Sequence, residues 1–464
     1  MKRKLIGLIL SAVMAVSLVG CGGSGDDGTT AGTSTDTPTK SESDNADAPV
    51  NAPSDDAQSL TVWCWDSFNV DAMKKAGEIY TADHPDVTIN VQETVSSDIQ
   101  TLIQTYAMSG ELNALPDIFL MDDQVFAKYL QNYPDVFADI TDSGIPFQDF
   151  AESKVANSVK DGKNYGVPYD SNTVIACYRT DYLEQAGYSI EDLTDITWDE
   201  FIVIGEDVLA KTGMPMLTNV QGEPDLLNMI LQSAGISVFD ENGGISLVDN
   251  EGLKEAMRVY LKLIDAKILQ EQTDWSGYQG SINNGTVVGT INGSWICATI
   301  MTTDQTQQEG NWAVTNMPKL NDYAGATNYS AQGGSTWAVS STCDNFDLAM
   351  DFFKTTWAGS TAFYDSILKD LGAIATYLPA AGNDAYNEPS AFFGGEAIYS
   401  KIVSYGSEIP KINKGIYWKE EKEALGTALT TIVNSVSDLD NVTDEDLDNV
   451  IAEAQATVQF NIGQ

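Results

Sequence analysis

The sequence is poor in histidine, cysteine and positive charge, and each shortage excludes a class of function. Its 464 residues include one histidine, five cysteines, and 24 lysines and arginines against 67 aspartates and glutamates. With His84 as the single imidazole, a zinc site of the His/Cys type has too few ligands. A formal net charge of −43 repels phosphate polymers, so we expect no nucleic acid partner and favour a neutral or cationic solute. The acidity also suits a secreted protein that must stay soluble, and both interpretations can hold.

Motifs that carry catalysis are missing as well. The sequence has no glycine-rich phosphate loop and no G-x-S-x-G elbow. Two carboxylates can hydrolyse a glycosidic bond, but among 67 acidic residues such pairs arise in any chain. Five aspartates in residues 438–448 suggest calcium, yet the central glycine and final glutamate of an EF-hand loop are absent, and Thr443 at the start of a helix explains them better. The residues alone therefore indicate no cofactor and no metal.

Four cysteines, at Cys64, Cys177, Cys297 and Cys343, are isolated, without CxxC or His/Cys spacing. Each lies in an apolar run, which favours buried free thiols. Pairing in an oxidising compartment stays open.

The N-terminus has the three parts of a signal sequence. Residues 2–4 are positively charged, residues 5–19 are apolar, and a glycine precedes Cys21. The apolar part is shorter than the roughly 20 residues of a membrane-spanning helix. Residues 18–21 resemble the bacterial lipobox, which implies that Cys21 becomes the lipidated first residue of a mature lipoprotein.

We therefore expect a signal peptide at residues 1–20 and a lipidated, flexible linker at residues 21–58. The linker consists mainly of Gly, Ser, Thr, Asp and Pro and cannot fold alone.

From residue 60 onward, strand and helix patterns alternate. Residues 60–65, 87–91 and 118–121 have strand patterns, with amphipathic helices between them. This alternation predicts the α/β fold class, in which ligands bind beyond the carboxyl ends of strands. The residues at those ends are Trp65, Asp66, Asp122 and Asp123.

Later segments predict a crossing between two bodies and a capped helix. Pro168 removes a hydrogen-bond donor and holds the preceding residue extended, which suits a crossing strand before the apolar run 173–178. Thr197 and Glu200 form a capping box for a helix that ends at Gly213.

The stretch 285–300 combines a strand pattern with an aromatic residue. Residues 286–291 read as a buried strand and residues 292–294 as a turn, which places Trp295 where strand meets loop. An indole there either closes a core or offers its face to a ligand, and this stretch alone favours the core.

Aromatic residues beside carboxylates or amides recur at such strand and loop ends. This combination suits sugars, because pyranose C–H faces stack on indoles while hydroxyls donate to carboxylates and amides. We expect about half of the tryptophans to be core residues, since pockets are built from few residues. The examples are Trp65–Asp66, Tyr169–Asp170, Asn292–Trp295, Gly334–Trp337 and Tyr417–Glu420.

Four blocks in sequence order carry a family resemblance. They are YTADHPDVTINV at residues 80–91, PDI at 116–118, the GK-x-Y-x-x-P-Y type segment at 162–169, and the Asn-Gly-Ser-Trp end of residues 285–295. The chain resembles the extracellular solute-binding proteins of bacterial ABC importers, in the cluster of maltose-binding protein, from about Leu60 to the C-terminus.

The resemblance implies two α/β lobes of the periplasmic-binding-protein type that close on a ligand without catalysis. Lobe 1 would comprise residues 59–166 with 319–358, and lobe 2 residues 167–318 with 359–464. Lobe closure would be a population shift driven by ligand contacts to both lobes.

Ligand-binding roles follow from the same resemblance. Trp295, in lobe 2, would stack on a sugar, and Trp418 would be a second stacking platform. The resemblance therefore reverses the earlier preference for a core role of Trp295. The other residues that it implies are Trp65, Asp66, Asp122, Asp123, Tyr169, Asp170, Glu223, Asp225 and Trp337.

The predicted function is therefore binding of an oligosaccharide outside the cytoplasmic membrane, by a lipid-anchored monomer that delivers it to an ABC permease. Two alternatives remain: a lipid-anchored glycan hydrolase, and a sensor that reports ligand occupancy to a membrane kinase.

Overall fold

The computed structural model describes residues 58–240, 243–302, 305–321, 323–436 and 439–463. The predicted signal peptide, almost all of the predicted linker and Cys21 lie outside the described residues, so these assignments stay predictions. None of the helices in the described ranges is both long enough and apolar enough to cross a bilayer.

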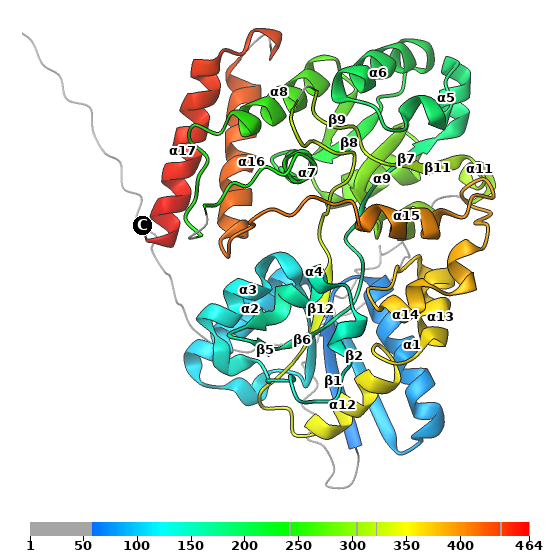
Figure 1. Ribbon diagram of the computed structural model, residues 1–464, viewed down its shortest axis with the longest axis vertical. Helices are drawn as coiled ribbons and strands as arrows, with labels where there is room; N and C mark the ends of the chain where they lie inside the picture. The colour runs from blue at the N-terminus through cyan, green and yellow to red at the C-terminus, as the bar shows by residue number, and fades with distance from the viewer. Residues whose placement is uncertain (1–57, 241–242, 303–304, 322, 437–438, 464) are drawn as a thin grey trace, which may run out of the picture. The chain divides into compact units, whose positions relative to one another are not determined.

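A five-stranded sheet forms the centre of one lobe, which we call the first lobe (Figure 1). Its strands, in order across the sheet, are β2 (Val87–Glu93), β1 (Gln58–Cys64), β3 (Ile118–Asp122), β12 (Ser335–Val339) and β6 (Gly166–Pro168). β1 is parallel to β2 and β3, and these are the three strands that the sequence pattern predicts. β12 comes from much later in the chain and runs antiparallel to both of its neighbours.

The second lobe contains two smaller sheets. In the first of them, β7 (Val174–Arg179) lies between β10 (Gly289–Gly293) and β11 (Trp312–Thr315) and is antiparallel to both. All residues of β7 are buried, as expected for an apolar run that is covered on both faces. The other sheet pairs β8 (Leu217–Val220) with β9 (Leu269–Gln272) in parallel. A short hairpin in the first lobe joins β4 (Val159–Lys160) and β5 (Lys163–Asn164).

The predicted strand at residues 286–291 is shifted toward the C-terminus in the structure. β10 includes Asn292 and Gly293, which the sequence assigns to a turn, because both residues pair with β7. The turn is confined to Ser294 and Trp295, and a helix begins directly afterwards. Tertiary pairing has overridden the local turn propensity here.

Helices cover the sheets, and two of them confirm the predicted caps. Thr197 and Glu200 form a capping box before α6, which ends at Gly213 in the left-handed conformation. Thr443 caps α17 and forms a capping box with Asp446. The helices are α1 (Ser67–Asp83), α2 (Ser96–Ser109), α3 (Asp123–Asn132), α4 (Glu152–Val155), α5 (Thr180–Ala186), α6 (Trp198–Thr212), α7 (Asp225–Ser233), α8 (Glu251–Asp265), α9 (Trp275–Asn283), α10 (Ile296–Met301), α11 (Gln305–Gln308), α12 (Phe346–Thr355), α13 (Thr361–Leu371), α14 (Leu378–Ala381), α15 (Ile398–Gly406), α16 (Trp418–Ser435) and α17 (Asp444–Ile462).

Two chain segments run side by side where the lobes meet. Residues 169–173 follow β6, and residues 331–335 lead into β12; a bridge between Thr173 and Ala331 and a hydrogen bond from the Tyr169 N–H to the Ser335 carbonyl join them. The exact lobe boundaries stay a prediction. In the predicted scheme α13 belongs to the second lobe, whereas here it packs against α1 of the first.

Candidate functional site

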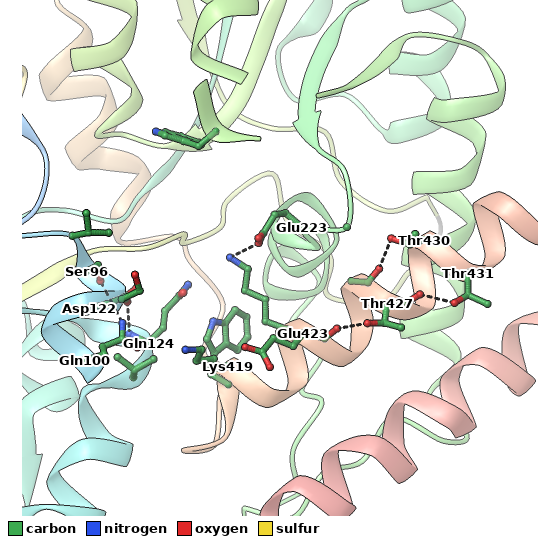
Figure 2. A pocket seen from close by; sticks show the side chains of 18 of the residues that line it. Ser96, Gln100, Asp122, Gln124, Glu223, Lys419, Glu423, Thr427, Thr430 and Thr431 are labelled. Carbon is green, nitrogen blue, oxygen red and sulfur yellow. Dashed lines mark hydrogen bonds and ion pairs between the residues drawn. The ribbon is translucent and has the colours of Figure 1, made fainter. Parts of the chain in front are cut away.

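A cavity of about 1250 Å³ has walls from both lobes. The first lobe contributes the N-terminal ends of α2 and α3, and the second lobe contributes one face of α16 and the loop at residues 222–223. Figure 2 shows Ser96 and Gln100 on one side of this outer cavity, and Thr430 and Thr431 farther along α16. The carboxyl end of β3 therefore lies at a cavity, as the α/β pattern predicts.

A smaller inner cavity of about 510 Å³ adjoins the outer one. Glu223, Trp275 and Lys422 line both cavities, so the two cavities are adjacent at these residues. The inner cavity is lined by residues of β8, α7 and α9 and by the end of β10. Both volumes match or exceed the roughly 300–1,000 Å³ of small-molecule sites.

Trp275 is the aromatic residue at the junction of the two cavities. Asp274 caps α9 by accepting a hydrogen bond from the Gly277 N–H, which fixes Trp275 at the start of the helix. The indole remains 39% exposed and stacks on Tyr278 at 4.7 Å with an interplanar angle of 14°. It is therefore a rigid, partly exposed apolar surface of the kind on which sugar rings stack.

Lys422 holds two acidic residues at the same junction. Its Nζ lies 2.8 Å from Glu223 Oε2 and 2.8 Å from Asp225 Oδ1. Burial lowers the pKa of Lys422, but the two carboxylates outweigh burial and hold this pKa above its ordinary value. The predicted ligand residues Glu223 and Asp225 are thus brought together as charged hydrogen-bond acceptors in the lining of the inner cavity.

Asp122 contributes a carboxylate to the outer cavity from the first lobe. It ends β3 and caps α3, where one oxygen accepts a hydrogen bond from the Gln124 N–H at 2.8 Å. Burial raises the pKa of Asp122 to about 6, against the opposing effect of that hydrogen bond. In its ionised form Asp122 can accept further hydrogen bonds.

Trp418 also lines the outer cavity, with most of its ring buried. The indole N–H has no hydrogen-bond partner among the described residues. The Lys414 ammonium lies 5.7 Å from the ring centroid, and burial lowers the pKa of this lysine. A cation over an indole face is a favourable contact, so Lys414 covers part of the face that the resemblance assigns to a sugar.

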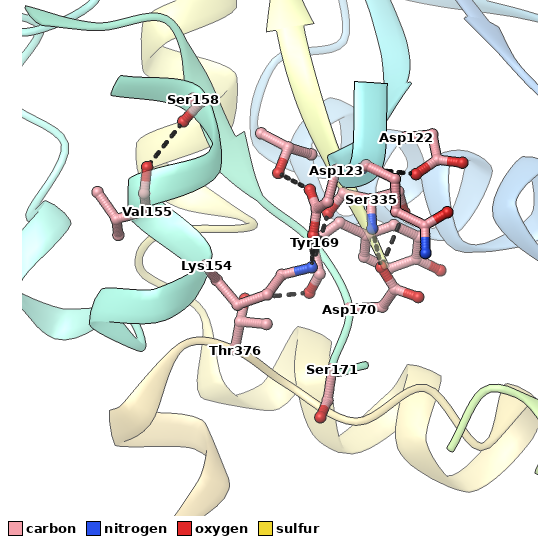
Figure 3. Close-up of polar contacts among 12 residues, drawn as sticks. Asp122, Asp123, Lys154, Val155, Ser158, Tyr169, Asp170, Ser171, Ser335 and Thr376 are labelled. Atoms are coloured by element: carbon pink, nitrogen blue, oxygen red, sulfur yellow. Dashed lines mark hydrogen bonds and ion pairs between the residues drawn. The ribbon is translucent and has the colours of Figure 1, made fainter. Parts of the chain in front are cut away.

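Asp123 and Asp170 are placed in a buried polar cluster where the lobes meet (Figure 3). Asp123 pairs with Lys154 and accepts a hydrogen bond from Thr336. Asp170 accepts hydrogen bonds from the N–H and the hydroxyl of Ser335, both at 2.8 Å. Both carboxylates have partners inside the protein, and Asp170 joins the two crossing segments through Ser335. Neither residue is in the linings of the two cavities, so their ligand roles stay predictions.

Two predicted ligand residues are core residues. Trp337 has no exposed surface, and Tyr169 is 1% exposed. Their rings stack on each other at 5.7 Å, and Trp357 closes the cluster. The central position of β12 covers Trp337 from both neighbouring strands. Trp337 and Tyr169 are outside the linings of the two cavities, so their ligand roles stay predictions.

Trp295 is close to Trp275 but does not line either cavity. Its indole N–H donates to the Gln332 carbonyl at 3.2 Å, and its ring is 5.8 Å from that of Trp275. Trp65 is partly buried against the core, and Asp66 precedes α1 at a φ of 58°. These three residues are outside the linings of the two cavities, so their ligand roles stay predictions.

Comparison with known proteins identifies the family. A profile described as bacterial extracellular solute-binding protein matches residues 75–394. The chain belongs to this family. It is 38% identical over 375 residues to the lactose-binding protein of Rhizobium radiobacter, covering 81% of this chain and 87% of that protein. It is 24% identical to the arabinooligosaccharide-binding protein of Halalkalibacterium halodurans, covering 88% and 90%.

Solved structures of solute-binding proteins share the fold. The GacH receptor of Streptomyces glaucescens GLA.O superimposes with a TM-score of 0.72 at 16% identity, covering 87% of this chain and 99% of that one. An ABC transporter-associated binding protein of B. animalis subsp. lactis, in complex with β-1,6-galactobiose, gives a TM-score of 0.71 at 19% identity, covering 87% and 97%. The predicted two-lobed α/β fold is confirmed.

Membership of the solute-binding family answers two questions that the residues left open. The family and the related chains are binding proteins and not enzymes, which removes the glycan hydrolase alternative. The family is extracellular, so this solute-binding protein acts outside the cytoplasm.

Sequence reasoning missed most residues of this solute-binding protein's cavities, among them Trp275, Lys422 and Gln124. The sequence does contain a local signal for Trp275. Asp274 can cap a helix, and Trp275 follows it at the first position of that helix, shortly after β9 ends. Lys422 and Gln124 carried no local signal, since their roles depend on which helices face the cavity.

Proposed function

We propose that this chain binds a carbohydrate in the outer and inner cavities and delivers it to the permease of an ABC importer. The observation that carries the proposal is the exposed indole of Trp275, stacked on Tyr278, beside the ion-paired carboxylates of Glu223 and Asp225. Stacking on the apolar face of a sugar and accepting from its hydroxyls are the two contacts that a neutral carbohydrate requires.

Acceptors in both lobes support the same proposal. Asp122 comes from the first lobe, and the residues around Lys422 come from the second. A ligand that touches both walls would favour the closed state, in which the two walls are close together. A ligand that touches a single wall would not change the populations of the open and closed states. The names of related proteins, lactose-binding and arabinooligosaccharide-binding, are consistent with a carbohydrate ligand.

Calorimetry with a panel of neutral oligosaccharides would test the proposal. Trp275→Ala should weaken the affinity for the ligand that binds by about thirtyfold or more, because truncating a central aromatic in a binding site costs about 2 kcal/mol or more. Phe460→Ala is the control, since Phe460 is an exposed aromatic at the end of α17, outside both cavities. A response to peptides or polyamines but to no oligosaccharide would contradict the proposal.

We further propose that Cys21 anchors the protein to the membrane as a lipidated monomer. The lipobox-like sequence at residues 18–21 supports this proposal. The Cys21→Ser variant should lose incorporated fatty acid and move from the membrane fraction to the soluble fraction. Unchanged incorporation of fatty acid in that variant would argue against the anchor.

A further inference from the structure

The wall of the outer cavity formed by α16 is long and regular. Two adjacent rows of residues, each repeating at every fourth position, line the cavity from the first turn of the helix to its last. At about 1.5 Å per residue, this wall is about 25 Å long. The two rows are Trp418, Lys422, Gly426, Thr430 and Asn434, and Lys419, Glu423, Thr427, Thr431 and Ser435.

The threonines of this wall present hydrogen-bond acceptors to the cavity. Thr427, Thr430 and Thr431 each donate the hydroxyl proton to the backbone carbonyl four residues earlier, at 2.9, 2.9 and 2.8 Å. Asn434 likewise donates its amide N–H to the Thr430 carbonyl at 2.9 Å. Because each threonine hydroxyl has one proton and that proton is used, the three threonines offer a ligand their oxygen lone pairs, and Asn434 keeps its carbonyl oxygen and its second amide N–H. A ligand with many hydroxyl donors suits such a wall.

The opposite wall contains polar atoms without partners. Gln100 Oε1 and Gln124 Nε2 have no hydrogen-bond partner among the described residues, although both side chains line the cavity. Leaving a buried polar atom unpaired costs free energy, so a ligand or ordered water that satisfies these atoms is favoured. Figure 2 shows Gln100 and Gln124 beside Asp122 on this wall.

The length of the cavity exceeds what a disaccharide needs. One sugar ring with its linkage spans about 5 Å, given carbon–carbon bonds of about 1.5 Å. A disaccharide would therefore cover less than half of the roughly 25 Å wall of α16. The cavity volume of about 1250 Å³ also lies above the usual range for a small ligand, with the inner cavity in addition.

We propose that the outer cavity binds a run of sugar units along α16, so that the ligand is an oligosaccharide of at least three units. Thr427, Thr430 and Thr431 are specificity-determining acceptors for the units beyond the junction at Trp275. This inference rests on the proposed carbohydrate function. It adds the minimum length of the oligosaccharide and the residues that bind its additional sugar units.

Calorimetry on the full chain with three length series tests the inference. The probes are β-1,4-galacto-, α-1,5-arabino- and α-1,4-gluco-oligosaccharides, each from two to six units. In a series that binds, the dissociation constant should fall at least tenfold between the disaccharide and the tetrasaccharide. Equal affinity for both lengths would overturn the inference and leave the proposed function intact. A folded protein that binds no member of any series would instead contradict the proposed function.

The double variant Thr427→Val, Thr431→Val isolates the acceptors. It keeps the side-chain shape and removes two hydroxyls, so tetrasaccharide affinity should fall about tenfold, as for two neutral hydrogen bonds, while disaccharide affinity changes less than about twofold. Thr457→Val is the matched control, because Thr457 is an exposed threonine on α17 with the same bond to a backbone carbonyl at 2.8 Å. An equal loss for both ligands, or a loss for neither, would overturn the role of the threonines.

Discussion

Glu421 tests how burial changes the pKa of a carboxyl group on α16, the helix that forms one wall of the outer cavity. It lies in the first turn of α16, has no exposed surface, and neither carboxyl oxygen has a hydrogen-bond partner among the described residues. Burial raises the pKa of Glu421 from 4.5 to about 8, because the neighbouring Lys422 offsets only part of that effect. The positive end of the helix dipole favours the ionised form by only about 0.3–1 kcal/mol, which is too little to reverse the shift.

The sign of the pH dependence follows from this raised pKa. Between the two pKa values the folded chain binds a proton at Glu421 that the unfolded chain has released, so stability falls as pH rises. The stabilising contribution is fully present below about pH 4.5 and is lost above about pH 8. The slope is about 1.4 kcal/mol per pH unit, and the whole effect is about 5 kcal/mol.

The assay is urea unfolding of the wild type and of Glu421→Gln at intervals from pH 5 to pH 9. The neutral glutamine removes the titration, so the free-energy difference between variant and wild type should shift by about 4 kcal/mol in favour of the variant across that range. Glu423→Gln, an exposed residue on the same helix, is the control and should show no such shift. Parallel pH profiles for wild type and Glu421→Gln would refute the argument that this carboxyl is neutral in the folded protein.

Two further predictions concern the other ionised groups. Burial raises the pKa of Asp122 to about 6, and Asp122 would accept hydrogen bonds from the ligand as a carboxylate, so ligand affinity should fall as the pH drops below 6. Calorimetry should find no such pH dependence in the Asp122→Asn variant. Constant wild-type affinity from pH 7 to pH 5 would contradict the prediction. Lys154→Met should lower the free energy of unfolding by about 3–5 kcal/mol, because it leaves Asp123 buried without its cation. A decrease of less than about 1 kcal/mol, measured by urea unfolding, would contradict a structural role for the ion pair.

The fold was predictable where local patterns and tertiary structure agree. The three parallel strands of the first lobe, the capping box at Thr197 and the cap at Thr443 were recognisable because a few neighbouring residues determine them. β10 was misplaced because its last residues, Asn292 and Gly293, favour a turn locally and become strand only by pairing with β7.

The candidate site was predictable only in part, because exposure of an aromatic residue is not a local property. Trp337 and Trp275 both occur beside small and polar residues in the sequence. Trp337 lies on β12, which is inserted between β3 and β6 and leaves no exposed surface on its indole. Trp275 begins α9 at the edge of two cavities and stays exposed.

By itself the sequence determined the α/β class, the order of the blocks that indicate the solute-binding family, and a preference for a neutral ligand with hydroxyl groups. These depend on composition and on neighbouring residues. Tertiary structure decided which acidic residues face the cavity: Asp122 lines it, whereas the adjacent Asp123 pairs with Lys154 inside the protein. The carboxyl end of β3 turns into α3 between these two residues, and only the packed elements around that turn determine that one carboxylate meets the cavity and the other a buried lysine.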